Sequence, residues 1–303
     1  MTVPSSAGFV TRARKGPFIR PFTKTPPGKV CPPVYVLSHA NGCSYRCDYC
    51  YLQLTFRHLA APTVFSNQQD LMREVRQFLG LPRPSVLHAG KLCDSLLYDS
   101  ETNLSKQLVP LFAAQDKHKL LLLTKSITIG NLLQISDHRN TVVSFSLNAP
   151  EIARRFERSA PTPEDRIAAA KKCQDAGYEV RVRIDPVIPI AGWRELYAPL
   201  VRAIVEGLNT KGLRVTIGNL RYFKSLPLYA KSRGADTSVF DVATRFDPTD
   251  GRMRVLPAVR LEMYQWFRAE LPVEAEVLPC KEPPQTWRTL GLDPAVPRCN
   301  CAL

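Results

Sequence analysis

Three cysteines in one short segment are the residues of this chain best suited to chemistry. Cys43, Cys47 and Cys50 lie within eight residues of one another, with C-x-x-x-C-x-x-C spacing, in the stretch NGCSYRCDYCYLQ (41–53). A structural zinc site takes four ligands, in two short pairs that a longer loop separates. A cubane [4Fe–4S] cluster also takes four ligands. Three thiolates leave one position open, and an open metal position is a reaction site.

Other cysteines lie far from this segment. Cys280, Cys299 and Cys301, near the C-terminus, are candidates to ligate a second cluster or a zinc ion together with Cys31. Cys173 falls inside a predicted helix and is expected in the core. Nine cysteines in a chain without an export signal favour metal binding or redox chemistry over a disulfide framework.

The charge of the chain predicts a polyanionic partner. Its 303 residues carry a formal net charge of +14, and residues 1–60 hold eight Lys/Arg against one acid, Asp48. Such an excess suits nucleic acid, most simply DNA, although a merely solubilising charge explains it too. No apolar run reaches the roughly 20 residues of a membrane-spanning helix. We therefore expect a cytoplasmic protein with no membrane partner.

The elements that must position the cysteines alternate between strands and helices. We predict strands at 34–39, 85–92, 119–126, 141–148, 178–185 and 213–220. We predict helices at 66–80, 103–115, 128–135, 162–177, 194–208 and 257–271. This alternation predicts an α/β fold with a parallel sheet, either open and doubly wound or a partial (β/α)6 barrel. The cysteines follow the first strand, where β/α barrels place catalytic groups, which favours the barrel.

The chain divides into three expected regions. Residues 1–32 are rich in Pro, Gly, Ser, Thr and basic residues, and predict an extended basic arm. Residues 33–225 hold the β/α units. Residues 226–303 are expected to form a helical and irregular extension, with the helix 257–271 and a cysteine-containing tail.

The cysteine triplet, with Tyr49 before the last cysteine, resembles the signature of radical S-adenosylmethionine (radical SAM) enzymes. The resemblance implies that Cys43, Cys47 and Cys50 ligate a [4Fe–4S] cluster. S-adenosylmethionine chelates the open iron in that superfamily. One electron then cleaves it to a 5′-deoxyadenosyl radical.

Longer blocks resemble the spore photoproduct lyase family within that superfamily. These blocks are YCYLQ (49–53), LTKS (123–126), SFSLN (144–148), the long segment 156–197 and GNLRY (218–222). The resemblance implies a lyase that repairs a UV-induced thymine dimer in DNA. It implies an electron donor such as flavodoxin or ferredoxin, and it places Tyr49 and Tyr51 on the path that returns a hydrogen atom to the product radical.

Cofactor contacts are expected on one face of the barrel. Lys125 ends the third predicted strand and is placed to pair with the carboxylate of S-adenosylmethionine. Ser144, Ser146 and Asn148 alternate along the fourth strand and share a face. The resemblance implies that these blocks surround the cofactor. The alternative for the serines is that they are small inward residues of the barrel.

Charged residues continue this face on the next strand. Asp185 shares a face with Arg181 and Arg183, because all three lie two residues apart. Buried charges must be paired, so this row is either a structural ion pair or part of the cofactor or substrate site.

A mixed basic and aromatic segment follows the sixth predicted strand. It consists of Arg221, Tyr222 and Phe223. Such side chains suit a backbone phosphate and an extruded base. The alternative is a loop that closes the barrel.

The second predicted strand departs from both patterns. Lys91 stands where many radical SAM proteins have an acid that meets the methionyl amino group. A lysine ammonium accepts no hydrogen bond, so Asp94 or Ser95 is expected to take that contact. Cys93 is the candidate hydrogen donor to the product radical. The alternatives are a small buried hydrophobe or a donor elsewhere, for another substrate.

Three functions follow from these patterns. The first is a radical SAM lyase acting on a thymine dimer in DNA. The second keeps the radical chemistry but changes the substrate to another nucleic-acid lesion, a modified RNA base or a peptide. The third is a non-catalytic nucleic-acid-binding protein whose cluster is structural or redox-sensing.

Overall fold

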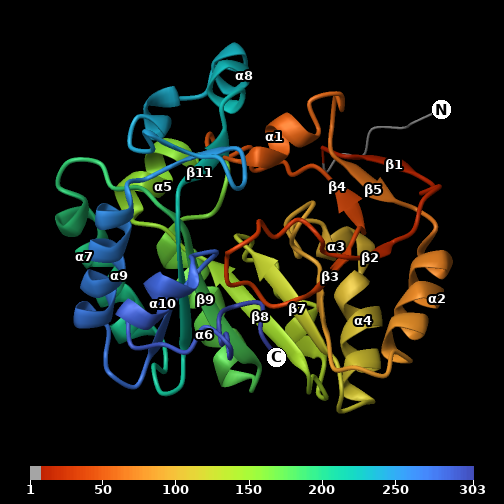
Figure 1. Cartoon of the computed structure of the whole chain (residues 1–303). Helices are drawn as coiled ribbons and strands as arrows, with labels where there is room; N and C mark the ends of the chain where they lie inside the picture. Colours follow the sequence, from red (N-terminus) through yellow and green to blue (C-terminus); the bar gives the residue numbers. More distant parts are fainter. Residues whose placement is uncertain (1–7) are drawn as a thin grey trace.

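One curved sheet organises the computed structural model, which describes residues 8–303 (Figure 1). The strand order is β14-β10-β9-β8-β7-β6-β3-β2; β2 is antiparallel to β3, and all other neighbours are parallel. The strands are β2 (Ile19–Pro21), β3 (Tyr35–Leu37), β6 (Val86–His88), β7 (Lys119–Thr124), β8 (Thr141–Ser146), β9 (Glu179–Val187), β10 (Arg214–Asn219) and β14 (Glu276–Pro279). All six predicted strands are confirmed, although β6 is shorter than expected. The fold is α/β with a largely parallel sheet, which keeps β14 and β2 as edges.

The central strands are apolar on both faces. β8 reads TVVSFS and is buried along its whole length, and four of the six residues of β7 are buried. Strands of a parallel sheet read this way because helices cover one face and the interior of the fold covers the other. The serines of β8 are the exceptions, and they point to polar contacts in the interior.

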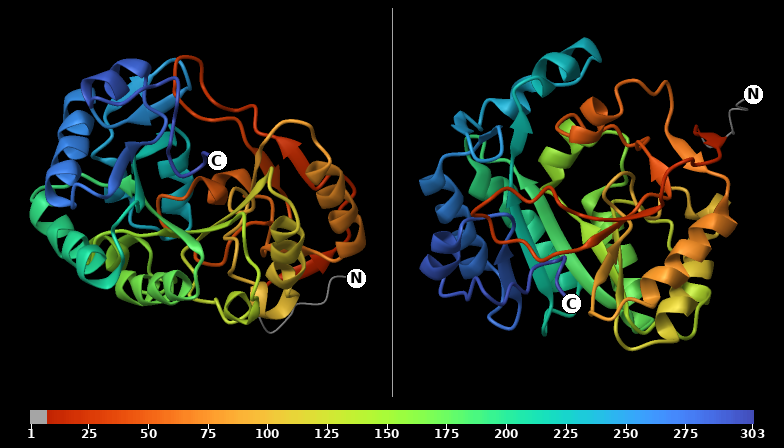
Figure 2. Two further views of the ribbon diagram at one scale, coloured as in Figure 1. Left: turned by 90° about the horizontal axis from the view of Figure 1, so that it is seen from below. Right: turned by 45° about the vertical axis from the view of Figure 1, so that its right-hand side comes forward.

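Helices cover the outer face of the sheet (Figures 1 and 2). They are α2 (Gln68–Leu79), α3 (Asp99–Thr102), α4 (Leu104–Ala113), α5 (Pro150–Phe156), α6 (Pro163–Asp175), α7 (Trp193–Gly207) and α9 (Pro257–Glu270). The helix α6 begins at Pro163 because the Thr162 side chain accepts a hydrogen bond from the Asp165 backbone N–H. Five of the six predicted helices are confirmed. In residues 8–303, no helix has both the length and the apolar character needed to cross a membrane.

The predicted helix at 128–135 is wrong. Only Leu132–Gln134 forms a helical turn there, of 3-10 type (η1). The Ser126 hydroxyl accepts a hydrogen bond from the Thr128 backbone N–H, which turns the chain before a helix can begin.

Two small sheets flank the main one, and neither was predicted. The first contains β1 (Val10–Arg12), β5 (Thr63–Phe65) and β4 (Ala40–Asn41); the second contains β11 (Arg221–Phe223), β13 (Arg252–Arg254) and β12 (Arg245–Asp247). The remaining elements are α1 (Tyr51–Thr55), α8 (Leu226–Ser232), η2 (Thr237–Phe240) and α10 (Pro284–Thr289). Within the expected basic arm, residues 8–32 supply β1 and β2, and residues 1–7 lie outside the described part of the chain.

The C-terminal tail enters the concave side of the sheet (Figure 2, left). The Arg181 guanidinium donates hydrogen bonds to the backbone oxygens of Asn300 and Ala302, at 2.8 and 2.6 Å. Ser144 on β8 donates to the Asn300 side-chain oxygen, and the Asn300 backbone N–H donates to Thr216 on β10, at 2.8 Å. The last residues are thereby fixed inside the sheet.

Candidate functional site

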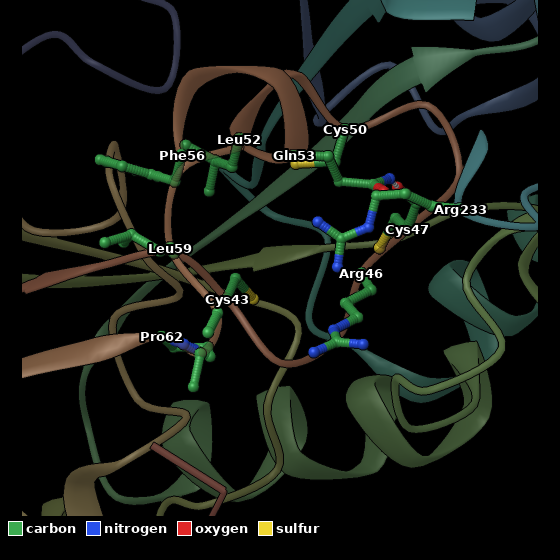
Figure 3. A pocket seen from close by; sticks show the side chains of 13 residues that line it. Cys43, Arg46, Cys47, Cys50, Leu52, Gln53, Phe56, Leu59, Pro62 and Arg233 are labelled. Atoms are coloured by element: carbon green, nitrogen blue, oxygen red, sulfur yellow. Dashed lines mark hydrogen bonds between the residues drawn. The ribbon is translucent and has the colours of Figure 1, made fainter. Parts of the chain in front are cut away.

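The three clustered cysteines border one pocket, between β4 and α1 (Figure 3). Cys43, Cys47 and Cys50 share this pocket with the guanidinium groups of Arg46 and Arg233. The pocket opens to solvent. Among residues 8–303, no group of three or more His, Cys, Asp or Glu side chains is arranged to hold a single metal ion.

Hydrogen bonds shape the cysteine loop from within. The Cys50 backbone N–H donates to the Cys47 oxygen at 2.9 Å, and the Gln53 side chain donates to the same oxygen at 2.6 Å. The turn needs Gly42, whose φ is +84° and whose N–H donates to the Leu92 oxygen. The helix α1 begins directly after Cys50. These bonds keep three thiols on one side of a short loop.

Burial governs the protonation of these thiols. It raises the pKa of Cys43 to about 12, and the charges of Asp94 and Cys50 add to the rise. Burial also raises the pKa values of Cys47 and Cys50 above their usual range. A metal centre here would bind with release of protons, because thiolates are the ligands.

A buried charge network lies beneath the loop. The Tyr49 hydroxyl donates to the fully buried Glu157 carboxylate, which also pairs with Lys125 at 3.2 Å and Arg166 at 2.7 Å. Burial tends to raise the pKa of Glu157, but Lys125 and Arg166 outweigh it and lower the pKa to about 2. Glu157 and Arg166 were not singled out from the sequence; their signal is their place in the block 156–197.

The structure separates the predicted cofactor residues into two sets. The Lys125 ammonium donates to the Ser146 hydroxyl at 2.8 Å, so these two lie together beside the cysteine loop. Ser144 instead binds the C-terminal tail. The Asn148 amide is fully buried and donates to the Glu157 carboxylate at 3.2 Å and to the Pro186 backbone oxygen at 3.1 Å. Lys125, Ser146 and Asn148 thus join the Glu157 network beneath the cysteine loop, and Ser144 does not.

Asp185 forms a buried ion pair. Its carboxylate accepts from Arg183 and from Arg221, the latter at 3.2 Å. Burial tends to raise the pKa of Asp185, but Arg221 and Arg183 hold it well below the usual range. A Cβ added at Gly218 would lie 2.3 Å from the Asp185 side chain, so only glycine fits there. The predicted charged row is therefore paired, and Arg221 belongs to it.

The predicted nucleic-acid segment is only partly on the surface. Tyr222 is buried, whereas Phe223 is 40% exposed beneath the guanidinium of Arg252, 4.7 Å from its ring centre. On the same small sheet, Phe246 is 43% exposed with the Lys224 ammonium 4.2 Å from its ring centre. Two exposed aromatic rings with cations above them therefore mark this sheet.

Cys93 lies in the loop after β6 rather than on the strand. Its side chain is buried in a small apolar cluster that includes Phe9 and Tyr98. The Tyr51 hydroxyl donates to the backbone oxygen of Lys91, two residues before Cys93. The loop therefore meets Tyr51 directly, while the Cys93 thiol packs among apolar side chains.

The two residues expected to replace the missing acid differ in their partners. The Asp94 carboxylate accepts from the Thr124 hydroxyl and the Lys125 backbone N–H, both at 2.6 Å. The Ser95 hydroxyl is buried and has no hydrogen-bond partner in the described part of the chain. A Cβ at Gly90 would come within 3.0 Å of this hydroxyl. Of the two, Ser95 is the residue whose side chain can still form a hydrogen bond.

Comparisons with known proteins show the family of this chain. The family model "Spore photoproduct lyase" matches residues 28–225. The chain belongs to the spore photoproduct lyase family. A curated relative, spore photoproduct lyase of Clostridium acetobutylicum, is 23% identical over 193 residues, which are 63% of this chain and 57% of the relative. The chain spans little more than half the length of the curated relatives that it matches.

Solved structures of this family share the fold. A spore photoproduct lyase complexed with dinucleoside spore photoproduct superposes with a TM-score of 0.75 at 21% identity, covering 89% of this chain and 81% of that one. A mutant lyase with bound AdoMet and dinucleoside spore photoproduct gives a TM-score of 0.71 at 22% identity, with the same coverage. At such identities the likeness shows the fold.

Proposed function

We propose that this chain is a radical SAM lyase that repairs a spore-photoproduct-type thymine dimer in DNA. The observation that carries the proposal is the set of three thiols around one pocket, in a member of the spore photoproduct lyase family. Relatives of known structure hold dinucleoside spore photoproduct and AdoMet. The curved parallel sheet then corresponds to a partial (β/α)6 barrel of the radical SAM type.

The residues present fit the two groups that this activity needs. Within residues 8–303, Cys43, Cys47 and Cys50 are the Cys, His, Asp or Glu side chains that line the pocket, and three thiols suit a [4Fe–4S] cluster with one open iron. S-adenosylmethionine, when bound to that iron and reduced, supplies a 5′-deoxyadenosyl radical. The electron comes from a small carrier such as flavodoxin or ferredoxin.

Lys125 and Ser95 are placed to hold S-adenosylmethionine. The Lys125 ammonium has three donor hydrogens, and Ser146 and Glu157 take two of them. The third is available for the carboxylate of S-adenosylmethionine. The unpartnered Ser95 hydroxyl is an acceptor for its ammonium, in place of the acid that Lys91 replaces.

Tyr51 links the cysteine loop to the loop expected to return the hydrogen atom. It follows Cys50 in the chain, and its hydroxyl donates to the Lys91 backbone oxygen. Tyr49 points the other way and its hydroxyl bonds to Glu157. We assign Tyr51 to the hydrogen path and Tyr49 chiefly to positioning the loop; Cys93 remains the candidate donor.

DNA is proposed to bind over the sheet of β11, β13 and β12. Phe223 and Phe246 offer exposed rings for unpaired bases, and Arg252 and Lys224 offer charges for phosphates. Base flipping exposes a damaged base to such a surface.

One observation favours a second candidate, a radical SAM enzyme with another nucleic-acid or peptide substrate. Cys93 is packed among apolar side chains rather than presented to the pocket that the three cysteines border. A hydrogen donor must lie within reaction distance of the product radical, and an error of 1 Å is costly. A different substrate would use a different donor.

A single anaerobic assay separates these candidates. The reduced protein is incubated with S-adenosylmethionine and an oligonucleotide that contains spore photoproduct, and thymine and 5′-deoxyadenosine are both measured. We expect both products, and neither from a variant with Cys43, Cys47 and Cys50 replaced by Ala. 5′-Deoxyadenosine without thymine would establish the second candidate. Neither product from protein with a loaded cluster would overturn both.

A further inference from the structure

Four cysteines outside the candidate site converge from three distant segments. Cys280 directly follows β14, Cys299 and Cys301 lie in the tail, and Cys31 precedes β3. The Val30 backbone N–H donates to the Glu282 backbone oxygen at 2.9 Å, which joins the segment of Cys31 to the segment of Cys280.

Packing and hydrogen bonds bring the four thiols to one place. Cys299 packs in one apolar cluster with Val30, the neighbour of Cys31. The Arg183 guanidinium reaches two thiols at once: Cys280 Sγ at 3.3 Å and Cys301 Sγ at 4.0 Å.

The electrostatics agree that the four are neighbours. Burial raises the pKa of Cys31, and the nearby Cys301 and Cys280 add to the rise. Burial likewise raises the pKa of Cys299, with Cys301, Cys280 and Cys31 as further contributors. Each thiol therefore lies within electrostatic reach of others in the group.

The surroundings of these cysteines hold uncompensated positive charge. The Lys91 and Lys281 ammonium groups lie 4.9 and 5.0 Å from the Phe22 ring centre, and Phe22 packs against the cluster that contains Cys301. In residues 8–303, neither lysine is within ion-pair distance of a carboxylate. Arg183 and Arg221 share one carboxylate, that of Asp185. Buried cations are costly unless an anion compensates them.

The same place contains buried donors without acceptors. The Asn300 side-chain N–H, between Cys299 and Cys301, is fully buried and unpartnered in the described part of the chain. The indole N–H of Trp287, in the same apolar cluster as Cys299, is also buried and unpartnered. Each such buried donor destabilises the fold unless an acceptor is supplied. Thiolate and sulfide sulfurs would accept both bonds.

We propose that Cys31, Cys280, Cys299 and Cys301 ligate a second iron–sulfur cluster. Four thiolates and bridging sulfides would supply the missing negative charge and the missing acceptors together. Hydrogen bonds and cations around the sulfurs tune the reduction potential of such clusters. Zinc has no redox chemistry, so it has no reduction potential for these cations and hydrogen bonds to adjust. We therefore favour iron over zinc. Lys91 lies between the two groups of cysteines. Its backbone oxygen accepts a hydrogen bond from Tyr51, next to Cys50, and its ammonium group lies over Phe22, which packs against the cluster that contains Cys301.

Iron content tests this proposal without any substrate. After anaerobic reconstitution of the full chain with iron and sulfide, we expect about eight irons per wild-type chain, from two four-iron clusters. The C43A/C47A/C50A variant should keep about four irons and a cluster absorption band. The C299A/C301A variant should also keep about four, and the signal of its reduced cluster in electron paramagnetic resonance should still change with S-adenosylmethionine.

The controls decide between the outcomes. Cys173→Ala, a buried cysteine outside both groups, should keep the wild-type iron content. Iron-free C43A/C47A/C50A protein with a native circular dichroism spectrum would overturn the proposal, and so would one zinc per chain in its place. If C299A/C301A does not fold, the iron content of C43A/C47A/C50A still tests the proposal, because that variant leaves the tail cysteines intact. Failure of the repair assay leaves the iron count unaffected, so the two proposals fail separately.

Discussion

The two groups of cysteines in this molecule differ in how the chain brings them together. Cys43, Cys47 and Cys50 lie on one loop, where local hydrogen bonds fix their spacing. The second group, Cys31, Cys280, Cys299 and Cys301, comes from three segments and depends on β14 and the tail. The first has three thiols and borders a pocket that opens to solvent, and the second has four thiols and is largely buried. An open site suits reaction, and a closed one suits electron storage or transfer.

The largest expected effect separates the groups by function. Cys43→Ala should reduce cleavage of S-adenosylmethionine about 1,000-fold or more, the scale seen when one member of a catalytic unit is removed. Cys299→Ala should leave cleavage measurable when a chemical reductant supplies electrons, because it spares the open site. Quantifying 5′-deoxyadenosine checks both variants. Equal loss in the two would show that the groups act as one site.

The second prediction concerns the carboxylate beneath the first group. Glu157→Ala leaves Lys125 and Arg166 buried without their anion, and we expect a loss of about 3–5 kcal/mol in the free energy of unfolding. Glu151→Ala is the matched control on α5, because its pair with Arg154 is exposed to solvent, and its loss should be much smaller than that of Glu157→Ala. Urea denaturation measures both. Similar losses would contradict the role given to Glu157.

The third prediction is the acid sensitivity of the same network. The pKa of Glu157 is lowered from 4.5 to about 2 in the folded protein, since Lys125 and Arg166 outweigh burial. A depressed pKa contributes stability that is present above the unfolded value and is lost as the pH falls through the folded value. Between pH 4.5 and 2, we expect this carboxylate to account for a loss on the order of 3 kcal/mol. Urea midpoints across that range should fall more steeply in the wild type than in Glu157→Gln, and parallel curves would contradict the assignment.

The fourth prediction concerns the proposed DNA-binding surface, which contains neither group of cysteines. Phe223→Ala should weaken binding of single-stranded DNA about tenfold, since stacking of one base contributes about 1–3 kcal/mol. Leu228→Ala is the control, because Leu228 is 77% exposed on α8, outside the sheet of β11, β13 and β12. Fluorescence anisotropy at one fixed salt concentration measures both. An unchanged dissociation constant for Phe223→Ala would show that DNA does not bind at β11.

Local patterns in the sequence predicted much of this architecture. The six parallel strands were predictable because buried strands are apolar runs bounded by helices with clear signals, such as Thr162 at the start of α6. The cysteine triplet was predictable because its spacing is local. The short strands β4, β5 and β11–β13 were not, because runs of two or three residues carry little periodic signal.

Long-range partners could not be predicted in the same way. Glu157 is one carboxylate in a charged stretch, and only the fold shows that Lys125, Arg166 and Tyr49 converge on it. Asn148 alternates with the two serines of β8, yet its amide donates to Glu157 whereas Ser144 binds the C-terminal tail. The strand period gives the face of a side chain but not its partner.

The smallest expected effect concerns Cys93, which belongs to neither group. Its thiol packs in a small apolar cluster with Phe9, Ala40, Val64 and Tyr98, so Cys93→Ala should cost about 1 kcal/mol of stability through the small cavity it leaves. Cleavage of S-adenosylmethionine should be unchanged, because no cluster ligand is altered. Because Cys93 is the candidate hydrogen donor, we expect its loss to change the product distribution, and unchanged products would exclude it from that role. Chromatography of the repair products decides the point: by-products of a misdirected radical in Cys93→Ala alone, and not in Cys173→Ala, would establish Cys93 as the hydrogen donor and tie its loop to the open site through Tyr51 and Lys91.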